Sequence, residues 1–71
     1  MEITGTVTYV PLSGGFWGIE GADGQKYTPS PALPGRFCAE GLRIKARVQP
    51  VMEFNIFMWG QTVSVEHIER A

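Results

Sequence analysis

Glycine and proline interrupt this chain at short intervals, with nine glycines and five prolines in 71 residues. Between them the chain is rich in β-branched side chains, because isoleucine and valine far outnumber leucine and five threonines are added to them. These residues favour strands, since their χ1 freedom is already restricted. Short β-rich stretches joined by turn residues are typical of a sandwich or a small barrel. The sequence therefore predicts an all-β fold.

Two stretches alternate with the two-residue period of a strand. From Leu42 to Gln49, apolar residues alternate strictly with Arg43, Lys45 and Arg47. In Ile3–Val10, one face carries isoleucine, glycine, valine and tyrosine and the other carries mainly threonine. Such patterns predict strands with one buried face. Weaker patterns predict four further strands, at Phe16–Glu20, Gln25–Thr28, Met52–Trp59 and Thr62–Ile68.

The connections between these strands indicate the architecture. Gly14-Gly15 and Asp23-Gly24 predict tight hairpin turns, and three closely spaced prolines exclude a central strand at Pro29–Pro34. The segment Gly35–Glu40 can form about one helical turn, with Gly41 ending it in a left-handed conformation. Three strands, a short helical connection and further strands predict a five- to six-stranded OB-like barrel, with an SH3-like barrel as the alternative.

Length and residue inventory limit the chemistry. A chain of 71 residues predicts a single domain spanning residues 1–71. Cys38 is the only cysteine and His67 the only histidine, so the sequence offers neither an intrachain disulfide nor a zinc site. Gly14-Gly15 precedes aromatic, strand-like residues rather than a helix, which argues against a phosphate loop. We expect no catalytic residues, no metal and no cofactor, and hence no enzyme.

The charge balance argues against a general attraction to polyanions. Six basic residues face seven acidic ones, giving a formal net charge of −1. The longest apolar runs are far shorter than the roughly 20 residues that span a bilayer. The segment Met1–Gly5 lacks the basic and apolar parts of a secretory signal. The cytoplasm is therefore the expected compartment.

A basic strip is the first of two candidate surfaces. On one strand face, Arg43, Lys45 and Arg47 would lie about 6.6–6.8 Å apart, close to the spacing of phosphates along a nucleic acid. Lys26 and the aromatic residues Phe16 and Tyr27 lie on the second and third predicted strands, through which OB folds bind oligonucleotides. The alternative is that the strip only keeps an outward face soluble. The balanced net charge favours this alternative.

A surplus of aromatic residues marks the second candidate surface. If Trp17, Ile19 and the apolar set of Leu42–Gln49 point inward, the two-residue period turns other rings outward. Either a second small core under Pro29–Pro34 and the last strand covers these rings, or they form a patch for a partner, a ligand or a second copy of the chain. The predicted interaction surface consists of Phe16, Tyr27, Phe57 and Trp59.

Several segments together carry a family resemblance. They are Gly14-Gly15-Phe16-Trp17-Gly18-Ile19, Asp23-Gly24 with Tyr27, Leu33-Pro34, Gly41-Leu42 and Met58-Trp59-Gly60. The chain resembles a family of small bacterial β-barrel proteins of uncharacterised function, some of whose members resemble lipoprotein domains. The resemblance implies a compact β fold and brings no catalytic residue, cofactor or partner. We predict a non-enzymatic binding or protein-interaction module, or alternatively a domain that binds single-stranded nucleic acid.

Overall fold

A computed structural model describes residues 1–12, 14–30, 32–52 and 59–71. Within these ranges the fold is all-β, as predicted. It consists of β1 (Glu2–Val10), β2 (Phe16–Gly21), β3 (Lys26–Pro29), a 3-10 turn η1 (Gly35–Phe37), β4 (Arg43–Pro50) and β5 (Gln61–Arg70). The strand predicted at Met52–Trp59 falls mainly on residues outside the described ranges, and its two end residues belong to no strand.

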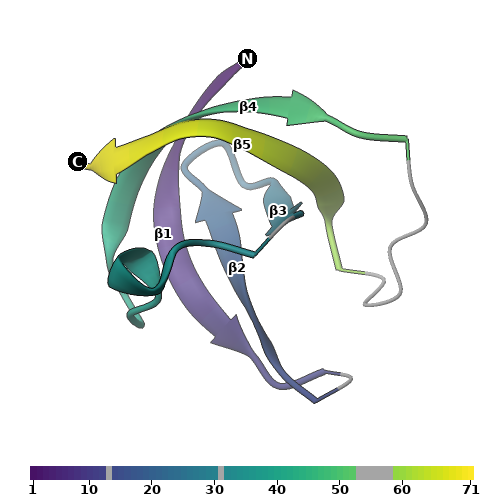
Figure 1. Cartoon of the computed structure of the whole chain (residues 1–71), viewed down its shortest axis with the longest axis vertical. Helices are drawn as coiled ribbons and strands as arrows, with labels where there is room; N and C mark the ends of the chain where they lie inside the picture. Colours follow the sequence, from purple (N-terminus) through teal and green to yellow (C-terminus); the bar gives the residue numbers. More distant parts are fainter. Residues whose placement is uncertain (13, 31, 53–58) are drawn as a thin grey trace.

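The five strands close into a small barrel in the order β1-β2-β3-β5-β4 (Figure 1). The strands β1, β2 and β3 form an antiparallel meander, and β4 returns to pair with the free side of β1. This spatial order, 4-1-2-3, is a Greek key. The barrel is closed by β5, which pairs antiparallel with β4 and parallel with β3.

Glycines allow the predicted turns. Gly14 and Gly15 have φ angles of 90° and 94°, in the left-handed region that glycine enters without steric cost. The Gly15 amide donates to the Leu12 carbonyl at 2.8 Å and closes the β1–β2 turn. The β2–β3 turn closes in the same way, since Gly24 has a φ of 86° and donates to Gly21 at 3.0 Å. Both predicted hairpins are therefore confirmed.

The helical connection is shorter than the predicted Gly35–Glu40. The turn η1 ends at Phe37, because Cys38 already leaves the helical region with φ −88° and ψ 77°. The chain must then return to β1, where the Gly41 amide donates to the Val7 carbonyl at 2.9 Å. Gly41 has the predicted left-handed φ of 82°, but it lies beyond the helical turn, which ends at Phe37. The helical turn is therefore short, because the residues after Phe37 lead back to β1.

The core confirms the alternation predicted for β4. Ile44, Ala46 and Val48 are buried, whereas all three basic residues between and beside them are exposed. On β1 the alternation holds only through Val7, since Tyr9 is 45% exposed and Val10 is buried. The β1–β4 ladder ends at Thr6, so the end of β1 extends past the strand that would enclose its inner face. The core also includes Ile3, Val7, Ile19, Tyr27, Leu33, Phe37 and Val63.

Candidate interaction groove

The third strand pairs with β2 along only the first half of one edge, and with β5 along the other edge. It pairs with β2 only through Tyr27 and Lys26, and then continues beside β5 to Pro29, which lies opposite Val63. The Ser30 amide donates to the Val63 carbonyl at 2.8 Å and extends this second pairing. The β2–β3 ladder thus stops at Tyr27, whereas the other edge of β3 remains paired with β5 as far as Pro29.

A groove of about 380 Å³ opens where β2 and β3 separate. We call it the aromatic groove; it is lined by Gly15, Phe16, Trp17, Thr28, Pro29, Ser30 and Ala32. One wall is the beginning of β2 and the other is the end of β3 with the residues that follow it. The lining is mainly apolar; its side-chain polar groups are the Thr28 and Ser30 hydroxyls and the Trp17 indole N–H. Apolar grooves of this composition commonly bind ligands or partner segments.

Two aromatic pairs flank the groove. Tyr9 and Trp17 lie edge to face with ring centroids 5.2 Å apart and an interplanar angle of 68°. Phe16 and Trp59 meet at 5.6 Å and 77°. Such edge-to-face contacts stabilise both rings of a pair. The Lys26 ammonium lies 5.6 Å from the Trp59 ring centroid, within the range of a cation–π interaction.

Gly18 of β2 and Thr28 of β3 together hold Trp59 in place. A Cβ atom added to Gly18 would overlap the Trp59 ring, so the absence of a side chain on β2 allows the ring to lie against the strand. The Thr28 hydroxyl donates to the Trp59 carbonyl and holds the backbone of this residue against β3. Phe16 and Trp59 are both half-buried, so the rings combine features of the two predicted alternatives: they pack on each other, and Phe16 still lines the groove.

Tyr27 does not lie on this surface, so its predicted surface position is wrong. Its side chain is 5% exposed and belongs to the core, because Tyr27 lies directly opposite the fully buried Ile19 and shares its inward face. Its hydroxyl donates to Asp23 Oδ2 at 3.1 Å. Burial, together with the hydrogen bond to Asp23 and its negative charge, raises the pKa of Tyr27. Phe57, the fourth predicted member, lies outside the described residues.

Glu40 fixes the end of β1 that carries Tyr9. Its carboxylate accepts hydrogen bonds from the Tyr9 amide at 2.9 Å and from the Thr8 hydroxyl at 2.9 Å. These two hydrogen bonds stabilise the charged form and lower the pKa of Glu40. The sequence analysis missed this contact, because it joins residues that are more than thirty positions apart and no local pattern marks it.

The basic strip is exposed as predicted, and acidic residues accompany it. Lys45 Nζ lies 3.7 Å from Glu2 Oε1, with both side chains at least half exposed. Glu2 belongs to β1, on one side of β4, and lies in register with Arg47. Glu69 belongs to β5, on the other side of β4, and lies in register with Lys45. The acidic neighbours therefore offset much of the positive charge of Arg43, Lys45 and Arg47.

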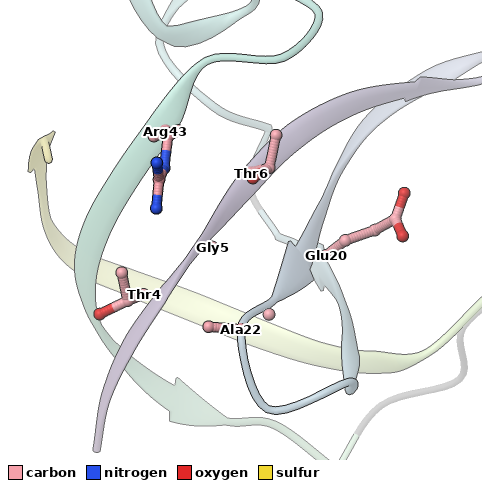
Figure 2. A pocket seen from close by; sticks show the side chains of 7 residues that line it. Thr4, Gly5, Thr6, Glu20, Ala22 and Arg43 are labelled. Carbon is pink, nitrogen blue, oxygen red and sulfur yellow. The ribbon is translucent and has the colours of Figure 1, made fainter.

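Two further cavities are more polar. The first, of about 480 Å³, lies over β1, and Figure 2 shows Arg43 and Glu20 projecting from the strands on either side of it. Thr4 and Thr6 of β1 also line this cavity (Figure 2). The second, of about 350 Å³, lies between β5 and the connection that leads to η1; it is lined by Ala32, Leu33, Pro34, Arg36, Val65, Glu66, His67 and Ile68.

Cys38 and His67 make separate contacts. The Cys38 thiol donates to the Leu33 and Pro34 carbonyls at 3.6 and 3.5 Å. His67 Nε2 lies 3.7 Å from Glu69 Oε1.

The part of the chain that the structure describes holds no group of three or more histidine, cysteine, aspartate or glutamate side chains that could bind a metal ion. It also contains no helix with the length and hydropathy needed to cross a membrane.

Comparisons with protein-family models, with curated proteins and with solved structures gave no match. The geometry of the chain itself therefore carries the functional argument. Sequence analysis identified Phe16 and Trp59 as surface rings but missed the groove beside them. Pro29, which cannot donate to a ladder, was the available signal for the separation of β2 from β3.

Proposed function

We propose that this chain is a non-enzymatic binding module that takes an apolar segment of a partner protein in the aromatic groove. The observation that carries the proposal is the groove itself, which has Phe16 and Trp17 on one wall and Pro29 on the other. Aromatic side chains are enriched at protein interfaces because they bury a large area with few rotatable bonds. The few polar groups in the lining favour an apolar occupant over a charged one.

An OB-like barrel agrees with this location. The Greek-key order, with its short helical turn between β3 and β4, favours the OB-like over the SH3-like alternative. OB barrels use the face of strands 2 and 3 and the adjoining loop between strands 1 and 2 for binding. The aromatic groove includes residues of β2, of β3 and of the β1–β2 turn.

Single-stranded nucleic acid is the second candidate, supported by the exposure of Arg43, Lys45 and Arg47 on one strand. It ranks second because Glu2 and Glu69 flank the strip, and because the described rings that could stack on bases lie by β2 and at the end of β1 that extends past the β1–β4 ladder. Binding of this kind must weaken steeply with salt, since each neutralised phosphate releases counterions.

Two exposed alanines provide a matched test. Ala32 lies at the edge of both the aromatic groove and the cavity beside β5, and Ala39 lines neither, so Ala32→Trp should occlude this side of the groove while Ala39→Trp controls for a new surface ring. The probes are a display library of short random peptides and a labelled single-stranded oligonucleotide. We expect selected peptides to bind the wild type and Ala39→Trp but to lose at least tenfold in affinity for Ala32→Trp.

Two results would contradict the proposal. One is a failure to select any peptide that Ala32→Trp excludes. The other is oligonucleotide binding that weakens with salt and is lost when Arg43, Lys45 and Arg47 are all changed to serine; this result would place the nucleic-acid function first. Sizing chromatography of the same variants reports whether the groove binds a second copy of the chain instead.

A further inference from the structure

Backbone groups of β2 point into the aromatic groove. The Ala22 amide donates to Thr4 of β1, whereas the adjacent Gly21 amide donates to Gln25 at the start of the returning strand. Because N–H and C=O groups alternate in direction along a strand, the odd-numbered residues of β2 face β3. Trp17 therefore directs both its N–H and its C=O toward the space between the two strands.

This part of β2 has no strand beside it in the described ranges. The β2–β3 ladder ends at Ile19 and Tyr27, and the residue that would face Trp17 in the same register is Pro29. Proline has no N–H to donate, and the β5 pairing of Pro29 uses the opposite edge of β3. The carbonyl of Pro29 points toward β2, since the Ser30 amide next to it points toward β5.

We propose that the aromatic groove binds its partner as a β-strand: an extended peptide enters between β2 and β3 and pairs through its main chain with the N–H and C=O of Trp17. Unpaired strand edges are templates for such an addition. An amide on the other side of the peptide can donate to the Pro29 carbonyl. The inserted strand thereby continues the sheet at the place where the β2–β3 ladder stops.

Strand geometry then predicts the side-chain preference of the groove. A peptide residue opposite Trp17 places its side chain on the Trp17 face of the sheet, and its two neighbours lie on the Phe16 face. Both faces present aromatic rings at this point. The preferred peptide is therefore extended and apolar on both faces, without proline at the residue that pairs with Trp17. A polyproline segment would dock by its rings alone and make no backbone ladder.

This inference rests on the proposed function, and main-chain substitutions test it separately. The probe is a capped peptide selected from the random library, prepared as a series with one backbone N-methyl group at each position. We expect N-methylation to reduce affinity at least tenfold at the residue that pairs with Trp17, less at the adjacent residue whose amide donates to Pro29, and little elsewhere, because successive N–H groups face opposite edges of the peptide.

The reciprocal change is made in the protein by chemical synthesis. Replacing the amide N–H of Trp17 with an ester oxygen removes one donor and leaves every side chain in place. It should reduce peptide affinity about fivefold to tenfold, the effect of one net hydrogen bond. The same ester at Asp23, in the exposed β2–β3 turn outside the groove, is the control and should change affinity less than twofold.

The outcomes separate the two proposals. Peptides that Ala32→Trp excludes, but that tolerate N-methylation at every position and the Trp17 ester, would overturn strand pairing and leave the groove as the binding site. Selected peptides that are insensitive to Ala32→Trp, or the absence of any binder, would overturn both. An amide resonance of Trp17 that gains protection from hydrogen exchange on peptide binding would support the strand directly.

Discussion

The strands β3 and β4 show how differently two parts of one barrel depend on their sequence. β4 lies between β1 and β5, and its apolar and basic residues alternate as the sequence pattern predicts. β3 is half as long, pairs with β2 at two residues and then follows β5. Local alternation holds along β4 even though its ladder with β5 has a register shift at Arg47/Val48. It does not hold along β3, where Tyr27, Thr28 and Pro29 are all buried.

The largest expected effect comes from the inner face of β4. Ile44 is fully buried, so Ile44→Ala should reduce the free energy of unfolding by about 2–5 kcal/mol through lost burial and an incompletely closed cavity. Urea denaturation followed by circular dichroism measures this. Lys45→Ala, one residue away and exposed, is the control and should change stability by less than about 1 kcal/mol. Equal losses in both variants would contradict the alternation on β4.

A smaller effect is expected on the outer face of β2, where Gly18 accommodates Trp59. Gly18→Ala should cost about 1–3 kcal/mol, because the new methyl group must displace the indole ring. Gly35→Ala is the matched control, since a Cβ there meets no atom within 4 Å and its φ is not left-handed. Tryptophan fluorescence should change in Gly18→Ala and stay constant in Gly35→Ala. Unchanged fluorescence and stability in Gly18→Ala would show that Trp59 does not rest on β2.

Ionisation of Tyr27 should reduce the free energy of unfolding at alkaline pH. Its folded pKa is raised, so its contribution to stability is fully present below the unfolded pKa, about 10, and is lost as the pH rises through the folded pKa. The free energy of unfolding should therefore fall above about pH 10. This part of the pH dependence should be absent in Tyr27→Phe.

In Asp23→Asn the tyrosinate of Tyr27 should form at lower pH than in the wild type, as followed by ultraviolet absorbance. Tyrosinate formation at the same pH in both proteins would contradict the contact with Asp23.

The smallest effect concerns Glu40, which is exposed and holds the end of β1. Its folded pKa is lowered, so its contribution to stability is present above the unfolded pKa and is lost as the pH falls through the folded pKa. NMR titration of the side-chain carboxyl measures this shift. Thr8→Val removes one of the donors and should raise the pKa of Glu40 toward its ordinary value. Thr4→Val, an exposed threonine elsewhere on β1, should leave the titration unchanged.

Local residue patterns were sufficient for most of the secondary structure. Alternation on β4, the glycine turns at Gly15 and Gly24, and the single helical turn all follow from interactions between residues close in sequence. The same patterns identified Phe16 as a residue outside the main core, and the structure pairs its ring with Trp59. They also marked Arg43, Lys45 and Arg47 as exposed, but not the acidic neighbours that other strands supply.

By itself, then, the sequence determined that the segments of β1 to β5 are strands and which face of β4 is apolar, because side-chain period and turn geometry act over a few residues. Only the tertiary structure decided that Tyr27 is buried, that Glu40 holds Tyr9 and that a groove opens beside Trp17. Each of these depends on which strands become neighbours when the barrel closes. The β2–β3 ladder stops at Tyr27, and Pro29 is the local signal for that end, but β5 pairs with the other edge of β3 through Val63. This second pairing joins residues far apart along the chain, and no local pattern encodes it.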